Sequence, residues 1–205
     1  MVVDDTYKTI INPSPEVIFK EKGSKFLGYV YPLEREAQVK AYVAVLKKKH
    51  HKARHWCYAW QLGIEKIQFR INDDGEPNNS AGQPIYGQIL SKEVRNVLVV
   101  VVRYFGGTKL GVGGLVNAYK TTAQLSLEAS NIVVKALVVR FKLVFEYADM
   151  NKVMRVIKEY QLLIESKNME LHCEYEVAVR KSEKEKVQQA FENLQRVKTM
   201  FVESE

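Results

Sequence analysis

The sequence predicts an α+β protein of two domains, and three observations lead to this class. Runs rich in β-formers alternate with amphipathic helical runs over the whole chain, which excludes all-α and all-β classes. The chain after residue 137 has the order β-α-β-β-α-β, a ferredoxin-like split βαβ motif that is complete by itself. The whole net charge of +7 lies before that point. We therefore expect one domain over 1–137 and a second over 138–205.

Composition is typical of a soluble globular protein, with 46% apolar and 27% charged residues. No apolar run reaches the roughly 18 residues that a membrane helix needs, and the start of the chain lacks the basic-then-apolar order of a signal peptide. The two cysteines, Cys57 and Cys173, lie far apart and predict no disulfide framework. We expect a cytoplasmic protein with no membrane partner, and we leave its oligomeric state open.

The first predicted elements are a hairpin and a helix. Residues 16–22 and 25–33 are rich in β-formers and are joined by a Gly-Ser turn, as in a β-hairpin. Residues 34–50 then place four apolar side chains at helical spacing, namely Val39, Tyr42, Val43 and Leu46. The basic run at the end of this helix suits the negative end of the helix dipole, which we favour over a dedicated nucleic-acid patch.

Two further strands are predicted at 55–63 and 66–71. Alternation divides the side chains of the first strand between two faces of a sheet, with His55, Cys57 and Ala59 on one face and Trp56, Tyr58 and Trp60 on the other. A loop rich in Asp, Asn, Gly and Pro follows over 72–84. A short helix is then predicted over 84–93, beginning at Pro84 because proline suits the first helical turn.

Residues 96–105 form an unbroken β-branched run, which predicts a strand buried on both faces. After a glycine-rich stretch, a helix is predicted from about Leu115, with Ala118, Tyr119, Thr122 and Ala123 also inward. The second domain is predicted to contain a strand over 138–147, a helix over 149–160, strands over 161–166 and 169–179 joined by a Lys-Asn turn, a helix over 182–194 and a strand over 197–203. A Ser182–Glu185 capping box is expected to open its last helix.

Five glycines fall within nine residues between the buried strand and the helix that follows it. A P-loop is excluded because Lys109 does not follow a glycine, and the dinucleotide fingerprint is excluded because Val116 stands where its third glycine belongs. A strand, a glycine turn and a helix N-terminus nevertheless favour an anion. The alternative explanation of the glycines is that the chain needs them for close packing or for positive φ. The candidate anion- or partner-binding residues are Arg103, Gly106, Gly107, Lys109, Gly111, Gly113, Gly114 and Lys120.

Asp73, Asp74 and Glu76 place three carboxylates within four residues, a density that could hold a divalent cation through oxygen ligands. The fixed spacing of an EF-hand loop is missing. We therefore favour an Asx turn in a surface loop, and we predict no metal and no cofactor.

His55 and Cys57 share one strand face, which raises two enzyme hypotheses. They could act as a base and a nucleophile, but no third, orienting group is evident. They could also bind zinc, even with His50 and His51 nearby, but a second closely spaced ligand pair is missing. We interpret Cys57 as a small buried hydrophobic residue.

Four stretches of the chain resemble the IMPACT family, whose bacterial members are often called YigZ proteins. They are KGSKFLGYVYPL, KARHWCYAW, NDDGEPNNSAGQPI and VVVRYFGGTKLGVGGLVNAYKTTA. The last stretch is long and very specific, and together the four span the first domain. The second domain suits the bacterial members of the family, which carry a ferredoxin-like tail.

The resemblance implies a fold and a setting. The first domain of the family has the β-α fold shared by some ribosomal proteins and domain four of elongation factor G, with a left-handed βαβ crossover against the usual rule. The tail is similar to domain five of that factor. Eukaryotic relatives influence translation initiation by binding a regulator of a starvation-responsive kinase, with the help of an extra domain that this sequence lacks. No established reaction accompanies the bacterial members.

The family signature falls on His55, Cys57, Asp73, Asp74, Gly75, Glu76, Pro77, Ala81, Gly82, Pro84, Arg103, Tyr104, Gly106, Gly107, Lys109, Leu110, Gly111, Gly113, Gly114, Leu115 and Tyr119. One departure is the loop sequence NNSAG, where members commonly read GTAG. Asn79 then stands at a position that often holds glycine. Since Asn tolerates left-handed φ, the turn is expected to survive.

These observations support three hypotheses. The first is a translation-linked binding module whose basic first domain contacts RNA, the ribosome or a protein partner. The second is a hydrolase-type enzyme that acts on an anionic small molecule in a cleft between the glycine stretch and the acidic loop. Its catalytic groups would be His55, Asp73, Asp74 and Glu76, which must then converge. The third makes the glycine stretch a protein-docking surface.

Overall fold

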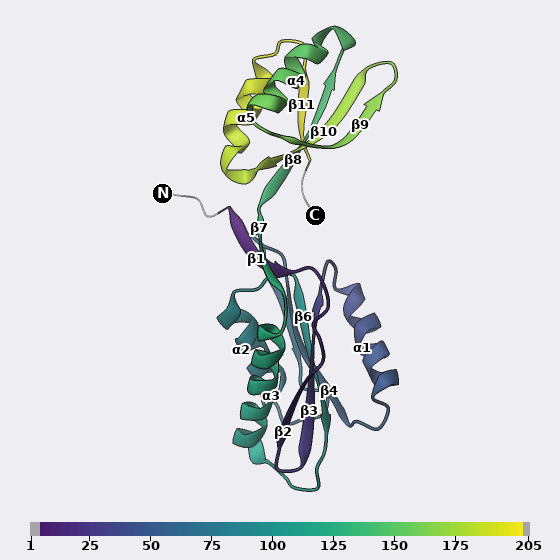
Figure 1. Cartoon of the computed structure of the whole chain (residues 1–205), viewed down its shortest axis with the longest axis vertical. Helices are drawn as coiled ribbons and strands as arrows, with labels where there is room; N and C mark the ends of the chain where they lie inside the picture. The colour runs from purple at the N-terminus through teal and green to yellow at the C-terminus, as the bar shows by residue number, and fades with distance from the viewer. Residues whose placement is uncertain (1–4, 203–205) are drawn as a thin grey trace. The chain divides into compact units, whose positions relative to one another are not determined.

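The structure, a computed structural model, describes residues 5–202. Within this range the chain forms five α-helices and several β-sheets (Figure 1). It divides into two compact units, one of residues 7–135 and one of residues 136 onward together with residues 5 and 6. Among the described residues, none of the helices combines the length and the apolar character that crossing a bilayer requires.

The first unit is built on a five-stranded sheet in the order β2-β3-β6-β4-β5, in which every neighbouring pair is antiparallel. Its strands are β2 (Val17–Glu21), β3 (Ser24–Pro32), β4 (His55–Leu62), β5 (Gln68–Asn72) and β6 (Val97–Tyr104). Every side chain from Val97 to Val102 is fully buried. The prediction of a strand buried on both faces is therefore confirmed at β6.

Helices cover the two faces of this sheet separately. α1 (Ala37–Lys49) packs on one face, while α2 (Gly82–Lys92) and α3 (Gly111–Glu128) pack on the other (Figure 1). Cys57 and Ala59 belong to the core beneath α2 and α3, whereas Trp56, Tyr58 and Trp60 belong to the core beneath α1. The predicted division of the β4 side chains between two faces is therefore confirmed.

The connection from β3 to β4 is a βαβ crossover. Both strands are antiparallel to β6, which lies between them, so they run parallel to each other, and α1 joins them. The left-handedness of this crossover stays a prediction. A two-stranded sheet of β1 (Thr6–Ile10) and β7 (Ile132–Ala136) completes the strands of this region and was not predicted.

The second unit has the predicted element order β-α-β-β-α-β. It comprises β8 (Val138–Phe145), α4 (Met150–Glu159), β9 (Leu163–Met169), β10 (Cys173–Arg180), α5 (Lys184–Glu192) and β11 (Lys198–Val202). The sheet order is β11-β8-β10-β9, with antiparallel neighbours throughout. One face of the sheet packs under both helices around Phe141 and Phe191. Residue 203 of the predicted last strand lies outside the described residues.

Two predicted helix starts in the first unit were wrong. α2 begins at Gly82 rather than Pro84, and α3 begins at Gly111 rather than near Leu115. The apolar periodicity of α3 does begin at Leu115. The preceding glycines occupy the first turn, where the backbone amides need no intrahelical acceptor.

In the second unit, the predicted capping box and one turn were wrong. The Ser182 hydroxyl lies in the 3-10 turn η2 (Lys181–Glu183) and donates to the Asp5 carboxylate at 2.6 Å, and α5 begins at Lys184. The predicted Lys-Asn turn lies inside β9, where Lys167 pairs with Tyr175 of β10. The chain turns at residues 170–172 instead.

Candidate functional site

The acidic loop begins with Asp73, whose carboxylate holds the start of α2. Its Oδ1 accepts hydrogen bonds from the backbone amides of Ala81 and Gly82 at 3.0 and 2.8 Å, and its Oδ2 accepts one from Asn79 at 2.9 Å. The negative charge therefore meets the positive end of the helix dipole. This contact explains why α2 begins before Pro84.

Replacing Asp73 with alanine is expected to destabilise the protein by about 0.5–2 kcal/mol, the usual cost of losing a side-chain cap. The loss should be local, so hydrogen exchange should accelerate at the amides of Ala81 and Gly82. Urea denaturation and amide exchange would measure both effects. Unchanged protection of these two amides would contradict the capping role.

Glu76 forms the centre of a buried ionic cluster. The Arg103 Nη1 group donates to Glu76 Oε1 at 2.7 Å, and the Tyr119 hydroxyl donates to the same oxygen at 2.8 Å. The side chains of Glu76 and Arg103 are only 4% and 6% exposed. Because water does not solvate them, each charge needs the other as its counter-ion. Burial raises the pKa of Tyr119, which therefore stays a neutral donor. Arg103, a candidate anion- or partner-binding residue in the sequence, is paired with Glu76 here.

His55 lies beside this cluster at the start of β4, opposite Arg103 of β6 in the sheet register. Its Nδ1 lies 2.9 Å from the carbonyl oxygen of Asp74, which can only accept, so Nδ1 carries a proton. Its Nε2 lies 4.0 Å from Glu76 Oε1. Of the groups that the enzyme hypothesis requires to converge, the side chains of His55 and Glu76 therefore lie together, and Asp74 reaches His55 only through its backbone carbonyl.

Cys57 is enclosed by the same elements. Its Sγ donates to the carbonyl oxygen of Asp73 at 3.0 Å and lies 3.3 Å from the Tyr119 hydroxyl. The side chain is fully buried, and this burial raises the pKa of its thiol, which suppresses the nucleophilic thiolate. The interpretation of Cys57 as a buried residue is confirmed.

The carboxylates of the loop are all engaged by the protein itself. Asp73 holds α2, Asp74 Oδ2 accepts from the Trp56 amide at 2.8 Å, and Glu76 holds Arg103. Throughout residues 5–202, no group of three or more His, Cys, Asp or Glu side chains is arranged to bind a metal ion. Each carboxylate of the loop therefore has a structural partner within the protein.

The glycine segment, which we define as residues 106–114, is largely exposed, and its glycines serve different purposes. Gly106 lies so close to the β2–β3 turn that an added Cβ would sit 1.9 Å from the carbonyl carbon of Gly23. Gly107 and Gly111 have φ of +88° and +70°, the left-handed region that favours glycine. Gly113 has neither constraint, because its φ is ordinary and an added Cβ would meet no described atom within 4 Å.

The structure also places the other residues that the sequence singled out, in and around the glycine segment and in the acidic loop. Lys109 and Lys120 are exposed, so both are available to a partner of the glycine segment. Gly114 packs against Leu110, whose Cβ would lie 3.1 Å from an added methyl group. Asn79 has φ +62°, which confirms that asparagine sustains the left-handed turn where relatives often have glycine.

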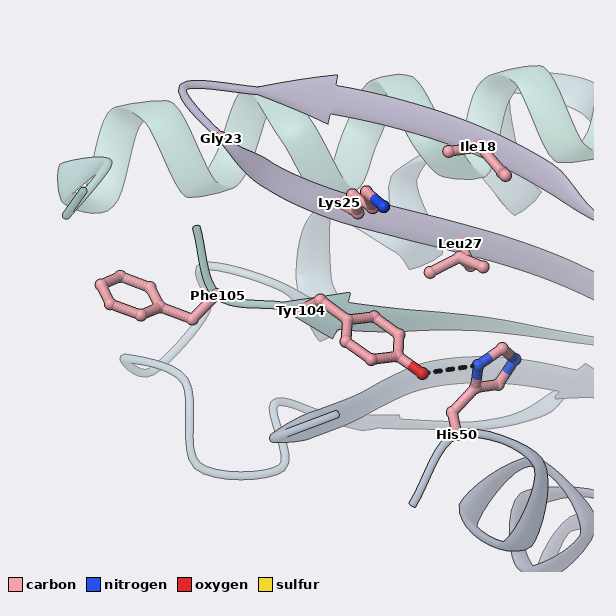
Figure 2. A pocket seen from close by; sticks show the side chains of 7 residues that line it. All are labelled: Ile18, Gly23, Lys25, Leu27, His50, Tyr104 and Phe105. Carbon is pink, nitrogen blue, oxygen red and sulfur yellow. Dashed lines mark hydrogen bonds between the residues drawn. The ribbon is translucent and has the colours of Figure 1, made fainter. Parts of the chain in front are cut away.

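A pocket on the α1 side of the sheet was missed by sequence reasoning. It measures about 400 Å³ and lies between the β2–β3 hairpin, the end of α1 and the end of β6 (Figure 2). His50 lines it, although the sequence suggested for this residue only a weak zinc hypothesis. The available signal was the pair Tyr104 and Phe105, two aromatic residues at the end of the buried strand.

The fold and the site together define an α+β protein with a closed acidic cluster beside an exposed glycine segment. Residues 22–127 match the family model described as the Impact N-terminal domain. The chain is 34% identical over 162 residues to an IMPACT family member of Haemophilus influenzae, covering 77% of this chain and 79% of that protein. The chain therefore belongs to the IMPACT family, whose bacterial members include proteins named YigZ and YvyE.

Solved structures also resemble this chain. One, described as a hypothetical protein, is 26% identical and covers 99% of this chain and 100% of that chain with a TM-score of 0.72. Another, described as the two-domain translational regulator Yih1, is 27% identical and covers 58% of this chain and 45% of that chain with a TM-score of 0.37.

Proposed function

We propose that this protein is a translation-linked binding module that contacts RNA or a ribosomal surface through the glycine segment. The link to translation is what membership of the IMPACT family implies. We also propose the domain division 1–137 and 138–205, with the elongation-factor-domain-four type of fold in the first domain and the ferredoxin-like fold in the second.

Gly113 is the observation that carries the proposal. Glycine inside a helix costs about 0.5–1 kcal/mol relative to alanine. Neither the packing nor the backbone of the described chain requires glycine at this position. A surface without a Cβ lets another molecule approach the backbone closely, as phosphate-binding loops do.

Charge supports the same partner. The net charge of +7 lies entirely in residues 1–137, exposed Lys109 lies within the glycine segment, and exposed Lys120 lies in the helix that follows it. Arg103 contributes no free charge because Glu76 compensates it. A phosphate backbone is the partner that a basic surface with open backbone amides favours.

Gly113→Ala separates binding from folding. We expect this variant to be more stable than the wild type by up to about 0.5 kcal/mol, because alanine favours the helix but residue 113 lies only in its first turn. We expect its affinity for ribosomes to fall at least about tenfold, a loss of about 1.4 kcal/mol. Denaturation and ribosome sedimentation over a salt series would measure the two effects, and the wild-type affinity should fall steeply with salt.

Gly87→Ala is the matched control. Gly87 lies in α2, outside the glycine segment, and an added Cβ there also meets no described atom within 4 Å. This variant should gain stability and keep its affinity. Equal affinities of the two alanine variants would refute the proposed surface. If Lys109→Glu abolishes capture of a protein partner and leaves ribosome binding intact, the surface serves protein docking instead.

A further inference from the structure

The pocket on the α1 side of the sheet has an apolar floor and an aromatic wall. Ile18 and Leu27 come from β2 and β3, Tyr104 is the last residue of β6, and Phe105 follows it. Phe105 is 41% exposed, and Tyr104 is partly exposed. In Figure 2 the Tyr104 hydroxyl points toward His50, while Phe105 lies at the other end of the group. Arg103 lies over the Phe105 ring, with its guanidinium carbon 5.6 Å from the ring centroid, so the exposed part of Phe105 is what a flat ligand can contact.

A chain of hydrogen bonds holds the Tyr104 side of the pocket in place. Glu16 pairs with Lys49 at 2.8 Å and accepts a hydrogen bond from the Tyr29 hydroxyl. Since that hydroxyl has one proton, the Nε2 of His50, 2.5 Å away, must donate to it. Nδ1 of the neutral ring then accepts from the Tyr104 hydroxyl at 3.0 Å.

The electrostatics of these groups agree with this arrangement. Hydrogen bonds from Lys49 and Tyr29 lower the pKa of Glu16, which keeps it an ionised acceptor. Burial, followed by the charge of Lys49, lowers the pKa of His50, which keeps its ring neutral. Lys25 is therefore the cation that lines the pocket, and it is exposed.

The pocket is continuous with the glycine segment. Gly23, at the hairpin turn, lines the pocket and lies against Gly106. The Gly106 amide donates to the Ser24 hydroxyl at 3.2 Å, which ties the two loops together. A strand of nucleic acid held at the glycine segment would thus pass directly beside Phe105.

We propose that this pocket binds the base of a nucleotide, with its ring stacked on Phe105 and its phosphate near Lys25. Three features select this ligand: an exposed aromatic ring that stacks on any base, a cation that lines the same pocket, and the net positive charge of the domain. The volume of about 400 Å³ lies in the ordinary range of small-molecule sites. The inference rests on the proposed function and names the chemistry of the partner as an unpaired nucleotide.

The test compares Phe105→Ala with Phe69→Ala, a control at another exposed phenylalanine of the first unit, which is 54% exposed. The probes are a uridine heptanucleotide, the same strand with abasic central positions, and AMP. Fluorescence anisotropy would measure strand affinity, and chemical-shift changes at residues 104 and 105 would report AMP. Phe105→Ala should weaken binding of the intact strand about tenfold or more, the effect of losing one stacked base.

The outcomes separate two sources of the base. Binding of the intact strand without binding of AMP assigns the pocket to RNA, whereas AMP binding that depends on Phe105 assigns it to a free nucleotide. The pocket proposal is overturned if the abasic strand binds as well as the intact one, if the two alanine variants behave alike, or if no probe binds. Should Gly113→Ala still weaken ribosome binding in those cases, the proposed function stands and only the pocket assignment fails.

Discussion

Replacing Glu76 with alanine is expected to destabilise the protein by about 3–5 kcal/mol, because it leaves the buried Arg103 charge without a partner. The two side chains are almost completely buried, and their contact is 2.7 Å long. The same carboxylate oxygen accepts the Tyr119 hydroxyl, so a second buried donor also loses its acceptor. Such a loss is a large part of the free energy of unfolding of an ordinary domain.

Chemical denaturation of three variants would test this expectation. Glu128→Ala is the control, because Glu128 pairs with Lys92 on the surface, where water screens the pair, and its removal should cost far less. Adding Arg103→Met to Glu76→Ala should recover part of the loss, since the unpaired charge is removed. If Glu76→Ala costs no more than Glu128→Ala, the cluster does not hold the loop as described.

Gly106→Ala has the second largest expected effect. An added Cβ would sit 1.9 Å from the carbonyl carbon of Gly23 and 2.2 Å from the Ser24 amide nitrogen, so the obstruction is backbone and not a flexible side chain. Overpacking of this kind costs about 1–3 kcal/mol, and occasionally more. The β2–β3 turn should be displaced, with faster amide exchange near Ser24.

Gly113→Ala provides the contrast for this measurement. The same substitution at this second position of the glycine segment should raise the free energy of unfolding, whereas Gly106→Ala should lower it. Denaturation midpoints of the two variants, together with amide exchange in the hairpin, would establish the difference. A Gly106→Ala protein as stable as the wild type would show that the hairpin and the glycine segment do not meet in solution.

The arrangement of the main sheet was predictable because its strands carry their own burial pattern. Alternation in β4 indicates two faces, and an uninterrupted β-branched run in β6 indicates burial on both. β1 and β7 gave no comparable signal, since each has only five residues and its partner lies far away in the sequence. The hydroxyl of Ser182 was misassigned for the same reason, because its acceptor is Asp5.

The residues of the candidate site were predictable from the sequence, but their function was not. His55, the acidic loop and Arg103 were singled out from separate stretches, and strand pairing brings them together. Sequence alone could not show that Glu76 compensates Arg103, because that contact depends on the register of β4 and β6. The sequence likewise does not distinguish Gly106 from Gly113. The difference is that Gly106 packs against the β2–β3 hairpin, which is visible only in the structure.

The pairing of β1 with β7 has a consequence for engineering. The Leu137 amide donates to the Asp5 carbonyl at 2.5 Å, so the chain enters and leaves the first unit at one place. Units whose ends meet tolerate circular permutation and transplantation into a host loop. A ring-closed or transplanted form of residues 6–136, which adds the outer ends of β1 and β7 to the first unit, should therefore keep its architecture.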